Sequence, residues 1–275
     1  MNNNEISLNI KNNNIITPLP KIKIFVILTV LTSEMASLMY ITPFLPFMIK
    51  SFDISEKDVG YYSGSILSSY MVGQFFSNLF WGYLSEKVGI KPIILFGLLS
   101  STICTIIFGF CSNIIWAISI RLINGLLSGN LGVTKTYLYL ITDKTNEAMG
   151  FTLLPVGICM GAIIAPAIGG FLETPSKHWS NIKEDHIFNI YPYLLPSIVI
   201  AIFPLIGFII GLIFIEEPYK NKNENENENE NENDVKSYIF NKNIFITIFL
   251  YFNIRFSLMG SDNLFPLLLA TSKKN

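Results

Sequence analysis

Long apolar stretches alternate with short polar segments along most of the chain. A helix needs about 20 predominantly apolar residues to cross the roughly 30 Å hydrocarbon core of a bilayer. The pattern predicts seven spanning helices, at 24–48, 59–83, 92–111, 114–140, 150–172, 192–215 and 244–270. Prolines occur within several of them, which membrane helices tolerate because neighbouring groups bond the freed carbonyls. We therefore predict an all-α, polytopic membrane protein.

The polar segments divide the chain into four regions. Residues 1–22 are rich in Asn and form a predicted polar cytoplasmic N-terminus, and residues 23–218 hold the first six predicted helices. Residues 219–240 contain an alternating Asn-Glu tract with no apolar residue to bury, which predicts a disordered cytoplasmic linker. Residues 241–275 hold the seventh predicted helix.

The distribution of lysines predicts the orientation. With the N-terminus inside, ten lysines outside the helices fall on the cytoplasmic side and six on the outer side. Cytoplasmic loops carry an excess of basic residues, so we expect a cytoplasmic N-terminus. The sequence does not distinguish a plasma membrane from a vacuolar-type membrane.

Composition narrows the possible functions. The chain is 51% hydrophobic and 14% charged, whereas soluble domains have about 25% charged residues. A net charge of −1 and only two arginines give no basis for nucleic-acid binding. No cluster of residues suggests a catalytic centre, a cofactor or a metal, and we predict none of these.

A charged segment, residues 82–92, separates the second predicted helix from the third. Gly82 and Gly89 lack a Cβ and are expected to permit a tight turn, and Pro92 suits the start of the next helix. The charged side chains, Glu86, Lys87 and Lys91, are expected at the membrane–water interface.

This segment resembles the loop signature G-x-L-x-D-R-x-G-x-K of the major facilitator superfamily. Leu84 stands at the leucine position, while Glu86 replaces the usual Asp and Lys87 the usual Arg. The resemblance implies that an acid at the cytoplasmic end of the fourth helix, here Asp143, engages the loop. We therefore predict an inner-gate latch of Glu86, Lys87 and Asp143. The alternative is a set of separate solvated charges, each worth under about 1 kcal/mol.

The fifth predicted helix carries a stripe of small residues. Spacings of four place Gly157, Gly161, Ala165 and Gly169 on one face, where another backbone can approach closely. With Pro166 and Gly170, the stripe resembles the signature G-x-x-x-G-P-x-x-G-G of proton-coupled drug exporters. The resemblance implies packing on helix eight of a second half. Helix packing of a general kind is the alternative.

Three of the charged residues within the predicted helices are the first candidates for proton or substrate binding. Arg121, in a segment that resembles the family element R-x-x-x-G, is expected to point into the bundle because an intramembrane charge is costly. Glu34 and Arg255 lie roughly 15–16 Å from the starts of helices one and seven at 1.5 Å per residue. The resemblance makes these helices symmetry-related, which predicts that Glu34 and Arg255 face each other. Glu34 bonding only to hydroxyls or water is an equally open alternative.

Other polar residues are secondary candidates. Lys135 lies near the cytoplasmic end of the fourth helix, where snorkelling to the interface is favoured over substrate binding. Gln74 and Asn130 either line a cavity or join helices, and Asp262 shares a helical face with Arg255.

Together these motifs resemble a major facilitator of the drug:proton antiporter type. The sequences of residues 125–137, 166–173 and 191–196 are most similar to those of the zinc-induced-facilitator-like group. The resemblance covers about residues 22–275 and implies the six-helix N-terminal half of the fold plus the first helix of a second half, the rest of which is missing. It also implies alternating-access antiport, with the lipid bilayer, a small organic substrate, a proton and the second half as partners.

Two other functions fit parts of the pattern. The chain could be a truncated or half-size membrane protein that does not transport and instead assembles with another half. A seven-helix receptor fits the helix count, but the lysine distribution and the lack of a cysteine partner for Cys111 in a later outer loop argue against it.

Overall fold

The computed structural model describes residues 17–173 and 187–218, together with the single residues 246, 249, 250 and 253. The chain divides into two units, residues 1–218 and 219–275. The helices of the first unit are α2 (Lys21–Met39), α3 (Leu45–Lys50), α4 (Val59–Val88), α5 (Ile90–Gly109), α6 (Ile114–Leu127), α7 (Asn130–Ile141), α8 (Glu147–Leu172), α10 (Ile187–Ile190) and α11 (Leu194–Phe214). Within the described residues all regular structure is helical, which confirms the all-α prediction.

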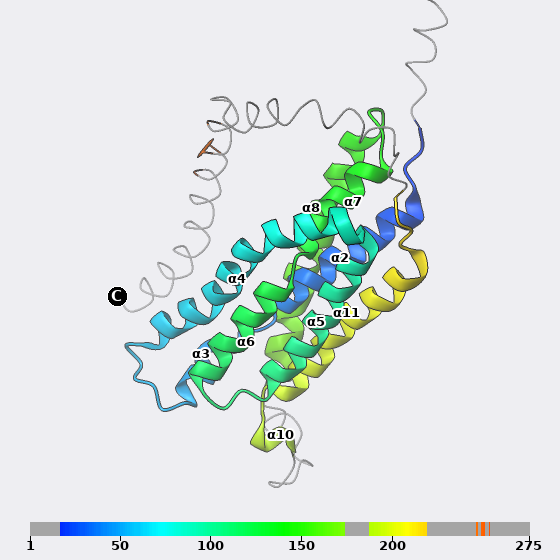
Figure 1. The fold of residues 1–275 in the computed structure, drawn as a ribbon. Helices are drawn as coiled ribbons and strands as arrows, with labels where there is room; N and C mark the ends of the chain where they lie inside the picture. Colours follow the sequence, from blue (N-terminus) through cyan, green and yellow to red (C-terminus); the bar gives the residue numbers. More distant parts are fainter. Residues whose placement is uncertain (1–16, 174–186, 219–245, 247–248, 251–252, 254–275) are drawn as a thin grey trace, which may run out of the picture. The chain divides into compact units, whose positions relative to one another are not determined.

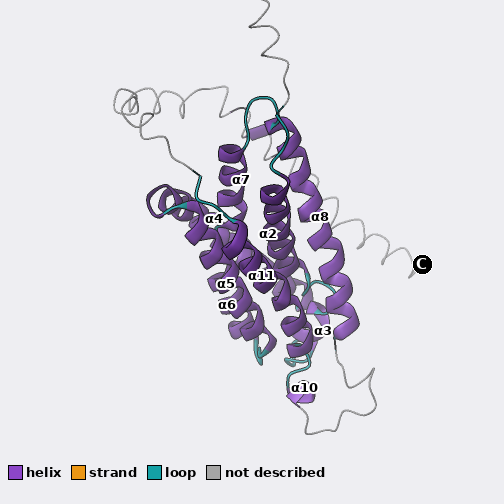
Figure 2. Ribbon diagram, turned by 90° about the vertical axis from the view of Figure 1, so that its right-hand side faces the viewer, coloured by secondary structure: helices purple, strands orange, loops and turns teal. Residues whose placement is uncertain are grey.

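The long helices of the first unit run alongside one another as a bundle (Figures 1 and 2). Helix α4 packs most extensively on α6, α2 on α8, and α11 on α5 and α2. Two clusters of buried apolar side chains fill the bundle. One surrounds Ile27 and Ile94, and the other surrounds Tyr40 and Phe108.

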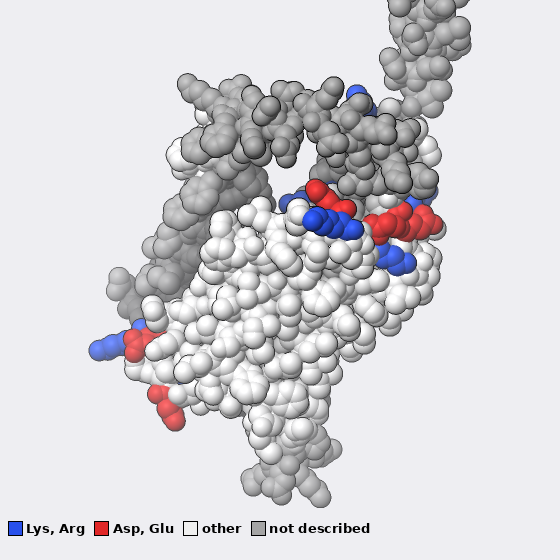
Figure 3. Space-filling model, viewed as in Figure 1, with Lys and Arg blue, Asp and Glu red and all other residues white. Residues whose placement is uncertain are grey.

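In the part of the chain that the structure describes, five segments are long and apolar enough to cross a membrane: Lys21–Met39, Ile90–Gly109, Ile114–Ile141, Glu147–Leu172 and Leu194–Phe214. Helix α4 has 30 residues, but serines, glycines, Gln74 and Asn78 lower its hydropathy. In Figure 3, the charged side chains in view gather towards two ends of this unit, with a wide uncharged surface between them. The six long segments predicted within 23–218 are therefore present. Of the predicted helix 244–270, only residues 246, 249, 250 and 253 are described, and these are helical.

The first predicted span is two helices rather than one. Helix α2 ends at Met39 and α3 begins at Leu45. Pro43 has no N–H to continue the helical bonding, and the Thr42 amide instead bonds the Met39 carbonyl at 3.1 Å. Pro43 thus interrupts the predicted span 24–48, which contains this proline and Pro46.

The fourth predicted span is also interrupted. Helix α6 ends at Leu127 and α7 begins at Asn130, with Ser128 extended at φ −97° and ψ 110°. Figure 1 shows the two helices following one another along the bundle. The continuous helix predicted for 114–140 therefore has a break near its middle.

The charged turn is shorter than predicted. Helix α4 continues to Val88, and Gly89 alone makes the turn, at φ 109° and ψ 158°. Gly82 lies inside α4, and a Cβ there would meet nothing within 4 Å. The prediction that Gly82 shapes the turn is wrong, whereas Gly89 does have the conformation that favours glycine.

Candidate functional site

Glu34 lies thirteen residues into α2, roughly 20 Å along the helix, and is only 4% exposed. Its Oε1 accepts hydrogen bonds from the Tyr70 hydroxyl at 2.5 Å, from Gln74 Nε2 at 3.1 Å and from the Ser128 hydroxyl. Its Oε2 accepts from Asn130 Nδ2 at 3.4 Å. One carboxylate therefore holds together α2, α4 and the α6–α7 junction. We call Glu34 and these four donors the carboxylate cage.

The break between α6 and α7 builds one side of the cage. Ser128 lies in the break and Asn130 begins α7, so both side chains reach Glu34 from the interruption. A Cβ on Gly97 of α5 would collide with the Asn130 side chain, and one on Gly129 with Trp81. Glycine at these positions leaves the space that the junction occupies. Interrupted membrane helices recur at transporter binding sites, where helix ends and unwound backbone groups contact the substrate or ion.

Among the described residues, no basic side chain forms an ion pair with Glu34. A buried carboxylate without a counter-ion is costly, and hydrogen bonds offset only part of that cost. The predicted partner, Arg255, lies outside the described residues, as does Asp262. Glu34 bonds two hydroxyls and two side-chain amides, whereas the alternative interpretation expected only hydroxyls or water.

Arg121 of α6 points into the bundle, as predicted, and is 2% exposed. Its Nη1 donates to the Ser37 carbonyl at 2.9 Å and its Nη2 to the Leu38 carbonyl at 3.0 Å. The last carbonyls of a helix lack intrahelical partners and carry partial negative charge. The guanidinium thus caps the interrupted end of α2, and lies 5.2–5.7 Å from the ring centroids of Tyr40, Tyr70 and Phe108.

The small-residue stripe of α8 packs on α2. A Cβ on Gly157 would lie 2.9 Å from the Leu28 carbonyl oxygen, and Cβ atoms on Gly161 and Gly169 would collide with the carbonyls of Thr32 and Tyr40. Ala165 is completely buried between them. The close backbone approach was predicted, and among the described residues its partner is α2. Packing on a helix of another half stays a prediction. Pro166 and Gly170 are only partly buried, beside this face.

Asp143 follows α7 and has partners other than the predicted ones. Its carboxylate accepts from the Thr145 and Thr17 hydroxyls and from the Thr145 amide at 2.8 Å. These bonds, the Thr145 hydroxyl first, lower the pKa of Asp143 from 3.8 to about 2. Within the described residues, Asp143 forms no ion pair with Lys87. The Lys87 Nζ instead lies over the Tyr83 ring, 4.5 Å from its centroid.

Two acids that the sequence did not single out lie at the same end. Glu217 Oε1 accepts from the Ile90 amide at 2.6 Å, and its Oε2 accepts from the Lys91 amide at 3.0 Å. Glu216 forms a 2.8 Å ion pair with Lys23. The only signal in the sequence is a Glu-Glu-Pro run directly after an apolar stretch.

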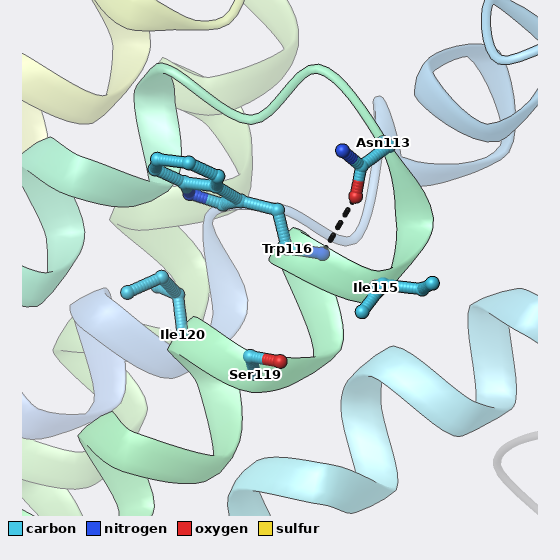
Figure 4. A pocket seen from close by; sticks show the side chains of 5 residues that line it. All are labelled: Asn113, Ile115, Trp116, Ser119 and Ile120. Carbon is cyan, nitrogen blue, oxygen red and sulfur yellow. Dashed lines mark hydrogen bonds between the residues drawn. The ribbon is translucent and has the colours of Figure 1, made fainter.

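The remaining candidates lie apart from the cage. Lys135 is exposed on α7, in agreement with snorkelling, and Leu84 is partly buried against the core. An open hollow of about 490 Å³ lies at the first turns of α6, lined by Asn113, Ile115, Trp116, Ser119 and Ile120 (Figure 4). There the Asn113 side chain caps α6 by accepting from the Trp116 amide at 2.8 Å. The described residues hold no group of three or more His, Cys, Asp or Glu placed to bind a metal.

The amino-acid sequence is similar to those of several known proteins. The sequence profile of the Major Facilitator Superfamily matches residues 27–272. The chain is 34% identical over 207 residues to the major facilitator superfamily multidrug transporter mfsB of Aspergillus fumigatus, covering 74% of this chain and 34% of that protein. It is 34% identical over 183 residues to Protein ZINC INDUCED FACILITATOR-LIKE 1 of Arabidopsis thaliana, covering 66% and 38%. It is also 28% identical over 137 residues to the multi-drug resistance efflux pump PmrA of Streptococcus pneumoniae, covering 50% and 34%.

The aligned part spans only 34–38% of the length of these relatives. The family profile nevertheless covers most of this chain, and the predicted likeness to the zinc-induced-facilitator-like group is confirmed. Together with the five apolar spans among the described residues, this match shows that the chain belongs to the Major Facilitator Superfamily and is an integral, multi-pass membrane protein.

Proposed function

We propose that this chain forms the first half of a transporter that exchanges a small organic solute for protons by alternating access. The observation that carries the proposal is the carboxylate cage, a buried Glu34 without a described counter-ion at the junction of three membrane segments. The names of the relatives, which include a multidrug transporter and an efflux pump, support a small organic solute. The loops have no His-rich tract, so direct zinc transport is not part of the proposal.

Proton binding at Glu34 would change which hydrogen bonds the carboxylate cage can form. A proton from the aqueous phase forms an O–H bond with one carboxylate oxygen, which removes the charge and turns that oxygen into a donor. The hydroxyls of Tyr70 and Ser128 can reverse and accept, whereas the amide nitrogens of Gln74 and Asn130 cannot. Protonation therefore favours a rearrangement at α4 and the α6–α7 junction, and this couples the proton to the position of helices.

Glu34→Gln tests the proposal at two levels. Infrared spectroscopy of the wild-type chain in nanodiscs, titrated with pH, should show the carbonyl stretch of a buried protonated carboxyl, and the variant should lack this band. In proteoliposomes that hold this chain together with the second half of the transporter, and with ethidium as the probe, the variant should lose accumulation driven by a proton gradient but keep downhill movement. Lys135→Gln, a change of an exposed charge on α7, is the matched control and should behave as wild type. Proton-driven accumulation that survives in Glu34→Gln would remove Glu34 from the coupling.

Three finer points belong to the same proposal. Glu86, Lys87 and Asp143 would form the inner latch in another conformation of the transport cycle, because here Asp143 bonds Thr17 and Thr145. Exchanging the charges of Lys87 and Asp143, singly and together, tests the latch, and a double variant no more active than the single ones would contradict it. The cytoplasmic N-terminus and the roles of Arg255 and Asp262 remain proposals.

The half-size, non-transporting alternative makes a different prediction. It allows the infrared signature of Glu34 but no ethidium movement in the proteoliposomes that also hold the second half.

A further inference from the structure

The turn between α4 and α5 is hydrogen-bonded to Glu217, which follows α11. Both carboxylate oxygens of Glu217 bond successive amides of the first turn of α5, Ile90 at 2.6 Å and Lys91 at 3.0 Å. Those amides have no intrahelical acceptor, and the positive end of the helix dipole favours a negative charge there. Bonds from an amide to a carboxylate are roughly twice as strong as neutral ones.

The turn is shaped to receive this carboxylate. A Cβ on Gly89 would lie 2.8 Å from Glu217 Oε1 and 3.0 Å from its Oε2, closer than real side chains approach. Gly89 also has φ 109°, a conformation that other residues rarely adopt. Gly89, the second glycine of the 82–92 segment, thus provides the backbone turn and leaves the space in which the Glu217 carboxylate lies.

The neighbouring acid provides a natural comparison. Glu216 reaches a different helix, pairing with Lys23 of α2, and its side chain is 74% exposed. Exposed ion pairs of this kind contribute little to stability. The two adjacent carboxylates therefore differ in what they hold: Glu217 fixes the start of α5, and Glu216 adds a solvated contact.

We propose that Glu217 is the positioning residue of the α4–α5 turn, holding the charged segment 82–92 in register with the end of α11. The consequence for transport rests on the proposed function, since it assumes that the segment acts as an inner gate. When that gate moves, the turn and the end of α11 then move as one piece. Without Glu217 the turn would loosen while the bundle stays folded.

The test compares Glu217→Gln with Glu216→Gln, a matched loss of one carboxylate at the adjacent position. Hydrogen–deuterium exchange of the chain in nanodiscs should show about ten-fold faster exchange at the first turn of α5 in Glu217→Gln. The same peptide should be unchanged in Glu216→Gln, and peptides from α2 and α8 should be unchanged in both. Glu217→Asp, which keeps the charge, should restore part of the protection.

Gly89→Ala is an independent second variant because it displaces the carboxylate from the other side. It should loosen the same turn, and combining it with Glu217→Gln should add little. In ethidium transport, Glu217→Gln should lower the maximal rate and leave KM unchanged.

Two results would overturn the proposal. One is equal exchange at the start of α5 in wild type and Glu217→Gln. The other is faster exchange throughout the bundle, which would make Glu217 a general stability element. If neither the wild-type chain nor any variant transports ethidium, the exchange data still decide the positioning role, so failure of the proposed function is distinguishable from failure of this inference.

Discussion

Arg121 of α6 donates to the Leu38 carbonyl of α2 at 3.0 Å, at the point where α2 is interrupted. A second bond, to the adjacent Ser37 carbonyl, completes a two-pronged cap. Four residues before Leu38, Glu34 is held by the carboxylate cage. Along α2, a buried acid and a buried base are thus engaged about one helical turn apart, each with its own set of partners.

Arg121→Lys should destabilise the bundle by about 1–3 kcal/mol, although it keeps the charge. A lysine ammonium is a single point and lacks the fork that reaches two carbonyls. Unfolding in detergent, followed by circular dichroism, measures the change. Lys135→Ala on the exposed side of α7 serves as the control and should shift stability by less than about 0.5 kcal/mol. Superimposable unfolding curves for wild type and Arg121→Lys would contradict the capping role.

Gly161→Ala should destabilise the α2–α8 contact by about 1–3 kcal/mol, because the added methyl collides with the Thr32 carbonyl and the two backbones must separate. Gly82→Ala is the matched control within α4. With nothing within 4 Å of its Cβ, it should be neutral or stabilise the helix by up to about 1 kcal/mol. The same unfolding measurement compares them, and equal stability of the two variants would argue against a close α2–α8 approach.

The hydrogen bond between the Thr17 hydroxyl and Asp143, in the turn between α7 and α8, should be sensitive to acid. The pKa of Asp143 is lowered from 3.8 to about 2 by the hydroxyls of Thr145 and Thr17, so its contribution is complete above 3.8 and is lost as the pH falls towards about 2. A spin label at Pro18→Cys, with exposed Cys159 replaced by Ser, should become more mobile over that range.

Two variants check the assignment to Asp143. In Asp143→Asn, mobility should be independent of pH over this range, whereas Glu147→Gln should respond as wild type does. A label that stays equally mobile from pH 4 to pH 2 in the wild-type background would show that Asp143 does not form this hydrogen bond.

The buried polar residues of the carboxylate cage were easier to select from the sequence than their partners. Glu34, Gln74 and Asn130 were selected separately as intramembrane polar residues, and they prove to be one cluster. Tyr70 and Ser128, which complete the cluster, gave no such signal because hydroxyls are common in membrane helices. Asp143 was expected to meet the 82–92 segment, but Glu217 occupies that position instead.

The sequence by itself determined the positions of the apolar helices, the placement of charges at their ends and the membership of a transporter family. These properties depend on local composition and on motifs of about ten residues. Tertiary structure alone decided where the span 114–140 breaks and which side chains meet, because those outcomes depend on contacts between distant segments. Glu34 and Ser128 are 94 residues apart, and Ile90 and Glu217 are 127 apart. A hydrogen bond over such a separation forms only after the helices have packed, so no local pattern can indicate it.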